Sequence, residues 1–174
     1  QRRLRQGEME IPDDATEQRY RASYAKMVEF IGRMERAGIP IVPGTDGFAG
    51  FGLHAELAAY VDAGLSPARV LQIATRDSAG VAGVGRDRGV LAVGRRADLV
   101  IVDGNPVDRI GDLSRMWRVV TQQHVIRPAA IHRSLGVRPF VDDAASAQAA
   151  MAERAERGSP LARIRSATGL HAGH

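Results

Sequence analysis

The apolar run Ile39–Val42 constrains the fold most, because it is short, rich in β-branched residues and followed by a glycine-rich loop. It predicts a brief strand, in which Pro40 and Pro43 cannot donate ladder hydrogen bonds. The run leads into Gly44-Thr45-Asp46, so it delivers one carboxylate into the loop. Three readings of Asp46 compete: a turn residue, part of a phosphate-binding loop, or a metal-binding catalytic carboxylate at the mouth of an α/β barrel.

Segments with helical periodicity lie on both sides of this run. Asp14 and Glu17 predict a capped helix start, and Gly38 is expected just after the end of that helix. Ser66 followed by Pro67 predicts the start of another helix. The predicted helices are Thr16–Ala37, Leu53–Ala63 and Pro67–Ala79.

The composition changes near Gly83, where glycine and β-branched residues become frequent. This change predicts a boundary, with helices before it and short strands after it. The predicted strands are Val90-Leu91, Leu99–Val102, Trp117–Thr121 and His124–Ile126. One or two helical turns are expected over Pro128–Leu135, a helix after Asp142 or Asp143, and a frayed tail from Leu161 to His174.

The glycines do not form a known phosphate-binding pattern. A P-loop requires Gly-Lys-Ser/Thr, and the single lysine, Lys26, lies elsewhere. The run that begins at Gly83 resembles a dinucleotide fingerprint, but Arg88 occupies the last glycine position. A Gly-x-Ser-x-Gly nucleophile motif is absent as well. Nucleotide binding and serine hydrolase chemistry are therefore disfavoured.

Charge and composition limit the partners. The formal net charge is +4, but the arginines are scattered among acids rather than gathered in one stretch, so nucleic-acid binding is not expected. No run reaches the roughly 20 apolar residues of a membrane span. Cysteine is absent, so a metal would need oxygen and nitrogen ligands. The chain begins at Gln1 without a signal-peptide core, which leaves a removed leader, an internal start and the compartment open.

Several motifs occur in an order that together resembles one family. The chain contains Gly-Thr-Asp at 44–46, His-x-Glu-Leu at 54–57, Ala-Gly-Leu-Ser-Pro at 63–67 and Ala-Thr at 74–75. The element Gly89–Pro106 ends in Ala-Asp-Leu-Val-x-x-Asp-Gly-Asn-Pro. These motifs resemble the C-terminal part of metal-dependent amidohydrolases, in the branch with imidazolonepropionase-like and prolidase-like hydrolases. The match covers Ile39–Ile110 and extends more loosely to Phe140.

The resemblance implies an α/β fold: the C-terminal part of a TIM-barrel amidohydrolase, with its last barrel strand and flanking helices, plus strands of a small β-sandwich. Residues 1–82 would belong to the barrel, residues 83–140 to the sandwich, and residues 141–174 to a C-terminal helix and tail. The family's Lys-x-Gly hairpin is replaced here by Thr121-Gln122-Gln123-His124. That departure concerns a turn and is not expected to affect catalysis.

The resemblance also implies a role for Asp46 as catalytic residue and metal ligand. It would contact one or two divalent ions, usually zinc, and would carry a proton from water to the leaving nitrogen. A carboxylate beside a cation stays ionised and can act as a base. The other ligands are expected outside this chain, because the family's first-strand His-x-His does not occur in it.

Other polar residues have competing readings. His54 is a candidate substrate-binding residue, but on the residues alone we favour a histidine that bonds local backbone at a helix start. Glu56 is expected to be a first-turn charge that favours the helix dipole. The pairs His124 with His132, and His171 with His174, lack a third ligand, so neither is expected to bind metal.

We therefore expect a hydrolase of C–N bonds in an amide, a cyclic amide or a dipeptide. Its expected partners are a small amide or peptide substrate and the remainder of the barrel, with no nucleic acid and no membrane. A homo-oligomer is left open, as are the substrate and the metal number. The isolated segment is expected to be inactive. The alternative is a non-catalytic binding or structural domain derived from an amidohydrolase.

Overall fold

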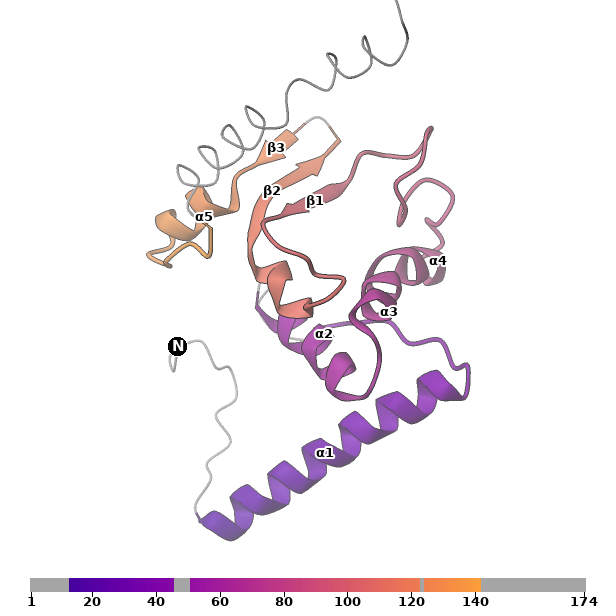
Figure 1. Ribbon diagram of the computed structural model, residues 1–174, viewed down its shortest axis with the longest axis vertical. Coiled ribbons are helices and arrows are strands. Elements are labelled where there is room, and N and C mark those ends of the chain that lie inside the picture. The colour runs from indigo at the N-terminus through magenta and orange to yellow at the C-terminus, as the bar shows by residue number, and fades with distance from the viewer. Residues whose placement is uncertain (1–12, 46–50, 123, 142–174) are drawn as a thin grey trace, which may run out of the picture.

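A computed structural model of the protein describes residues 13–45, 51–122 and 124–141. These residues form a mixed structure in which helices come first and a three-stranded antiparallel sheet follows. Figure 1 shows the sheet on the opposite side of helices α2 and α3 from helix α1. The predicted change from helices to strands along the chain is therefore present.

Helix α1 (Asp14–Arg36) has a well-formed cap at each end. Its N-cap is Asp13, whose side chain accepts a 2.7 Å hydrogen bond from the Thr16 amide. The prediction that Asp14 starts the cap is wrong by one residue, because Asp14 is already helical and Asp13 has the extended backbone of a cap residue. Gly38, with a φ of +70°, follows the helix as predicted.

Helix α1 packs closely against the end of α2 at Gly32. This glycine is buried, and a Cβ built on it would lie 2.4 Å from the backbone oxygen of Ala63, at the end of α2. The N-terminal half of α1 extends away from the other labelled helices (Figure 1). There Tyr24 is 56% exposed and Met27 is 66% exposed, although both lie on the apolar stripe of the helix.

Residues 39–45 form no strand, so the prediction of a strand over Ile39–Val42 is wrong for this chain. Pro40 and Pro43 lack a backbone N–H. None of the strands in the described parts of the chain pairs with this segment. A strand forms only when a neighbouring strand supplies the partners of its hydrogen-bond ladder. In place of such a ladder, the side chains of Glu56 and Tyr60 on α2 hydrogen-bond to the backbone of this segment.

Helix α2 (Gly52–Asp62) leads into a composite helical stretch. The helix predicted over Pro67–Ala79 consists of α3 (Pro67–Gln72), a π-helical segment η2 (Ile73–Asp77) and α4 (Ser78–Val81). The predicted Ser66 cap is present, since Ser66 Oγ accepts from the Arg69 amide at 3.2 Å. The Ser78 hydroxyl donates to the Ile73 carbonyl at 2.7 Å, a local bond that accompanies the wider turn.

The hydrophobic core lies between these helices and the following segment. Its buried members are Leu57, Tyr60, Leu65, Val70 and Ile73. Ile110 and Leu113, from the 3₁₀-helix η3 (Ile110–Ser114), pack against this cluster. The segment between strands β1 and β2 therefore shares one core with the helices.

The sheet contains β1 (Leu99–Val102), β2 (Met116–Thr121) and β3 (His124–Ile126) in the order β1-β2-β3. The three predictions for these strands are confirmed, with β2 beginning one residue earlier than expected. The predicted strand Val90-Leu91 does not form, and Leu91 is 80% exposed. Gly89 has a φ of +85° on one side of it, so the chain turns there instead of extending into a strand.

The turn after β2 is fastened to the start of β1 by Asp98. The Asp98 carboxylate accepts from the Thr121 hydroxyl at 2.9 Å and from the Gln122 amide at 3.2 Å. These bonds support Gln122 at a φ of +49°, which non-glycine residues seldom adopt. Hydrogen bonding by Thr121 lowers the pKa of Asp98, so the carboxylate stays ionised as an acceptor.

Helix α5 (Pro128–Ser134) confirms the one or two turns predicted from Pro128. The predicted helix after Asp142 or Asp143 and the tail from Leu161 lie outside the described residues. Within the described parts of the chain, no helix combines the length and apolar character needed to cross a membrane.

Candidate functional site

The predicted catalytic residue and metal ligand, Asp46, lies outside the described residues, but the chain on both sides of residues 46–50 is described. A Cβ built on Gly52 would lie 3.2 Å from Thr45 Cγ2. The missing side chain of Gly52 therefore lets Thr45 approach the first turn of α2. The residue before Asp46 and the start of α2 lie side by side.

Glu56 of α2 binds the backbone just before Asp46. Its Oε1 and Oε2 lie 3.0 Å and 3.1 Å from the Gly44 amide nitrogen, which donates to the carboxylate. The expectation that Glu56 is a first-turn charge is wrong, because the first turn of α2 contains no acidic residue. Its carboxylate instead accepts a hydrogen bond from the Gly44 amide, which is not paired with any described strand.

Tyr60, one turn further along α2, supports this contact. Its hydroxyl lies 3.0 Å from Glu56 Oε1 and 3.2 Å from the Val42 carbonyl oxygen. A tyrosine hydroxyl has one proton, so it donates to one of these two acceptors at a time. Burial raises the pKa of Tyr60, and the hydrogen bond and negative charge of Glu56 raise it further. The hydroxyl is therefore a permanent donor at neutral pH.

His54, the candidate substrate-binding residue, lies in the first turn of α2 and is half-buried. Burial lowers its pKa below the ordinary value of about 6.5. A neutral imidazole offers one donor and one acceptor, which suits the recognition of a polar ligand. The substrate-binding role itself stays a prediction.

An aromatic cluster joins the start of α2 to helix α5. The ring of His132 stacks on Phe51 with centroids 6.4 Å apart, and Phe140 contacts both rings edge-on at 5.8 Å and 6.2 Å. These separations are typical of favourable aromatic pairs. Phe51 immediately precedes α2, so the cluster packs α5 and Phe140 against the start of that helix.

The described residues do not fit a complete metal site. Within residues 13–45, 51–122 and 124–141, no group of three or more histidine or carboxylate side chains is placed to hold an ion. His132 packs among phenylalanines, and His124 lies exposed on β3. His171 and His174 lie outside the described residues. A metal bound by Asp46 would therefore need ligands from elsewhere.

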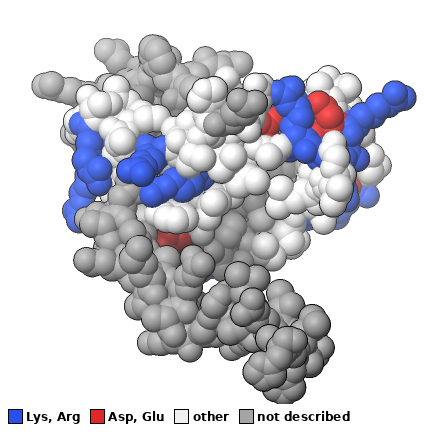
Figure 2. Space-filling model, turned by 90° about the horizontal axis from the view of Figure 1, so that it is seen from above, with Lys and Arg blue, Asp and Glu red and all other residues white. Residues whose placement is uncertain are grey.

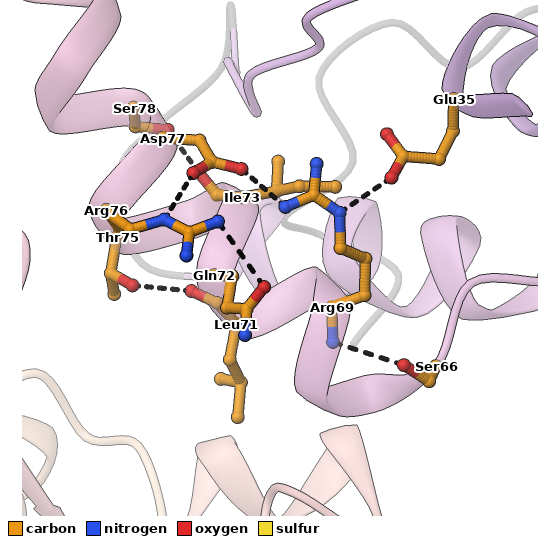
Figure 3. A network of polar contacts seen from close by, with 10 residues as sticks. All are labelled: Glu35, Ser66, Arg69, Leu71, Gln72, Ile73, Thr75, Arg76, Asp77 and Ser78. Atoms are coloured by element: carbon orange, nitrogen blue, oxygen red, sulfur yellow. Dashed lines mark hydrogen bonds and ion pairs between the residues drawn. The ribbon is translucent and has the colours of Figure 1, made fainter. Parts of the chain in front are cut away.

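Arg69 connects three elements through ion pairs, as Figure 3 shows. Its Nε lies 2.6 Å from Glu35 of α1, and its Nη1 lies 2.5 Å from Asp77 at the end of η2. Asp77 also accepts from Arg76 at 2.8 Å. The hydrogen bond from Arg76 lowers the pKa of Asp77, and Arg69 lowers it further.

A cavity of about 390 Å³ opens beside this network. Its lining includes Ile39, Pro40 and the Glu35–Arg69–Asp77 ion pairs. It thus lies at the start of the 39–45 segment, whereas Asp46 follows the end of that segment. Because every charged side chain that lines this cavity is already held in an ion pair, we assign the cavity to structure rather than to catalysis.

The basic side chains form separate groups on the face shown in Figure 2. One of these groups is mixed with acidic side chains. No single continuous basic stripe is visible over the described residues on that face.

Sequence reasoning missed the contacts of Glu56, Tyr60 and Arg69. The spacing of Glu56 and Tyr60, four residues apart on one helix, does indicate that they touch. Nothing local indicates that Glu56 reaches Gly44, because these two residues lie 12 positions apart in the sequence. The same holds for Arg69 and Glu35, which lie 34 residues apart.

Comparison with a sequence model of the Amidohydrolase family gives a match over residues 21–138. Among curated proteins, none matches the chain.

Several solved structures are similar to this chain. A protein from Bifidobacterium longum described as a prolidase is 34% identical, with a TM-score of 0.54, over 63% of this chain and 30% of that one. A Xaa-Pro dipeptidase with bound methionine in its active site is 25% identical, with a TM-score of 0.54, over 57% and 25%. A prolidase complexed with N-methylphosphonate-L-proline is 26% identical, with a TM-score of 0.52, over 57% and 26%. The chain thus spans between 25% and 30% of the length of these structures.

Proposed function

Because this chain belongs to the amidohydrolase family, we propose that it is the C-terminal part of a metal-dependent hydrolase that acts on C–N bonds. The observation that carries the proposal is the family match over residues 21–138, together with 34% identity to a prolidase. The span of 25–30% of the similar structures supports the view that most of the barrel comes from elsewhere.

The proposed architecture assigns residues 1–82 to the end of a TIM barrel and residues 83–140 to a small β-sandwich. Residues 141–174 would form a C-terminal helix and tail. The irregular 39–45 segment would become the last barrel strand when neighbouring strands pair with it. Supporting this, its backbone is already held at Val42 and Gly44 by side chains of α2. The remainder of the barrel is therefore the principal proposed partner.

Asp46 would carry the proton in this reaction. Water attacks the carbonyl carbon, the Asp46 carboxylate takes the proton that the water loses, and the same carboxyl later donates it to the leaving nitrogen as the C–N bond breaks. A bound divalent ion, zinc by analogy with the family, would polarise the carbonyl and lower the pKa of water towards about 7. One or two such ions would need ligands outside this chain. His54 would contact the substrate.

Dipeptides of the Xaa-Pro type are the first substrates to test, because two of the similar structures are described as prolidases and a third as a Xaa-Pro dipeptidase. Cyclic amides and simple amides complete the panel. The second candidate function is a non-catalytic binding domain. The absence of a three-ligand cluster within the described ranges is the observation that favours it.

The test is to express the full reading frame that contains this chain, load it with zinc and assay the panel. Asp46→Asn should lower kcat by about 10²- to 10⁴-fold, the usual contribution of a proton-transferring group. Asp14→Asn, on the exposed first turn of α1, is the matched control and should retain activity. Activity in Asp46→Asn would overturn the catalytic assignment.

Two further observations separate enzyme from binding domain. A His-x-His motif in the upstream sequence, after a predicted strand, supports the enzyme. Its absence, with no hydrolysis of any panel member, supports the binding domain. The 174-residue chain alone, given zinc, should hydrolyse nothing; hydrolysis that disappears in Asp46→Asn would show that the chain needs no other ligands.

A further inference from the structure

We propose that Glu56 is a positioning residue for the reaction, acting through the Gly44 backbone. Its two carboxylate oxygens lie 3.0 Å and 3.1 Å from the Gly44 amide nitrogen. Gly44 stands two residues before Asp46 in the sequence. The inference rests on the proposed role of Asp46. It adds that the Glu56 carboxylate holds the Gly44 backbone, which precedes Asp46 in the chain.

In the 39–45 segment, the Gly44 amide donates the hydrogen bond that ties the backbone to Glu56 of α2. Pro40 and Pro43 have no N–H to offer, and the segment pairs with no described strand. A hydrogen bond from an amide to a carboxylate is charge-assisted and therefore stronger than a bond to a neutral acceptor. Without it, the contacts of α2 with this segment would be the Tyr60 hydroxyl near the Val42 carbonyl and the packing of Thr45 against Gly52, neither of which engages the Gly44 amide.

Tyr60 makes Glu56 a rigid acceptor. The Tyr60 side chain is 5% exposed and belongs to the hydrophobic core with Leu57 and Val70. Its hydroxyl lies within 3.0 Å of Glu56 Oε1, so it orients the carboxylate towards Gly44. A buried, packed ring loses little additional freedom when it forms this bond.

Positioning matters here because proton transfer depends on geometry. A displacement of about 1 Å at a catalytic group can cost about 100-fold in rate. Glu56 lies one turn beyond the first turn of α2 and does not itself need to touch the substrate. Its effect is therefore expected in kcat, with a smaller effect on KM.

The experiment uses the full-length, zinc-loaded protein and four variants. Glu56→Leu keeps the side-chain volume and removes the acceptor, so kcat should fall about 10- to 100-fold with KM nearly unchanged. Glu56→Gln keeps one oxygen that can accept from Gly44, so it should recover most of that loss. Glu29→Gln, which removes a charge from an exposed ion pair with Lys26, is the control and should match the wild type. The fourth variant is Asp46→Asn.

A readout at the hydrogen bond itself accompanies the kinetics. Exchange of the Gly44 amide proton should be slow in the wild type and in Glu56→Gln, and faster in Glu56→Leu. If Glu56→Leu does not fold, Glu56→Asp replaces it, because its carboxylate is one methylene short of Gly44. A purely structural role would lower the folded fraction of each variant and leave kcat per folded molecule unchanged.

The outcomes separate the two proposals. If Asp46→Asn is inactive while Glu56→Leu or Glu56→Asp keeps the wild-type kcat, the positioning role is overturned and the proposed function stands. If Asp46→Asn remains active, the proposed function fails, and the positioning role fails with it even if Gly44 exchange responds to Glu56. Loss of kcat in Glu56→Leu with recovery in Glu56→Gln supports both.

Discussion

Arg69 in α3 and Asp77 at the end of η2 are joined by a 2.5 Å contact between Nη1 and Oδ2. Residues eight positions apart in a uniform α-helix point about 80° away from each other. The π-helical segment Ile73–Asp77 widens the helix between them and rotates Asp77 towards the face that carries Arg69. The π-helical turn therefore places Asp77 where it can form the ion pair with Arg69.

Arg69→Met is expected to lower the free energy of unfolding by about 1–2 kcal/mol, because it leaves the carboxylates of Glu35 and Asp77 partly buried without their shared partner. The loss is limited to this range because the Arg69 side chain is 34% exposed, so water screens its ion pairs. Urea unfolding of the purified protein measures it. Arg21→Met, at a pair with side chains 77% and 41% exposed, should cost about 0–0.5 kcal/mol. Equal losses in the two variants would contradict the role given to Arg69.

Gly32→Ala should destabilise the protein by about 1–3 kcal/mol, because the new methyl group would lie 2.4 Å from the Ala63 oxygen and push α1 from α2. Gly80→Ala is the matched control in α4. A Cβ at Gly80 meets no atom within 4 Å. The substitution should therefore raise the free energy of unfolding by about 0.4–1 kcal/mol, because alanine lowers the conformational entropy of the unfolded chain. Thermal unfolding of both variants checks the contrast, and a stabilised Gly32→Ala protein would refute the close approach.

Tyr60 should ionise well above the ordinary tyrosine pKa of about 10, because burial and Glu56 both raise its pKa. The stabilisation linked to this shift is fully present below about pH 10 and is lost as the pH rises further, since the unfolded tyrosine then ionises first. Ultraviolet titration of phenolate formation measures the step. It should disappear in Tyr60→Phe, and a Tyr60 that titrates near pH 10 would argue against the contact with Glu56.

His54 should titrate below about 6.5 in the folded protein, because burial lowers its pKa. The unfolded chain then binds more protons than the folded one, so the His54 contribution to stability is present above about pH 6.5 and is lost as the pH falls towards the folded-state pKa. NMR titration of the His54 ring protons gives the pKa directly. In His54→Gln this part of the pH dependence should vanish, and an unchanged stability profile would count against the burial effect.

Much of the fold follows from local sequence signals. The caps at Ser66 and Gly38 and the three strands from Leu99 to Ile126 depend on neighbouring residues, so periodicity and turn chemistry predict them. The predicted strand at Ile39–Val42 is wrong because a strand also requires a partner, which the described residues do not supply. The predicted strand at Val90-Leu91 is wrong because Gly89, with its positive φ, turns the chain directly before it.

The sequence alone determined the family, through the order of its motifs, and with it the candidate Asp46. It also determined approximately where the α-helices and the three paired strands lie, although most end residues of the helices differ from the predicted ones. Only the tertiary structure decided that Glu56 accepts a hydrogen bond from Gly44, and that Arg69 joins α1 to η2 through ion pairs. The physical reason is range. Caps and periodicity act within a few residues, whereas these contacts join groups 12 and 34 residues apart, whose meeting depends on how the packed helices cross.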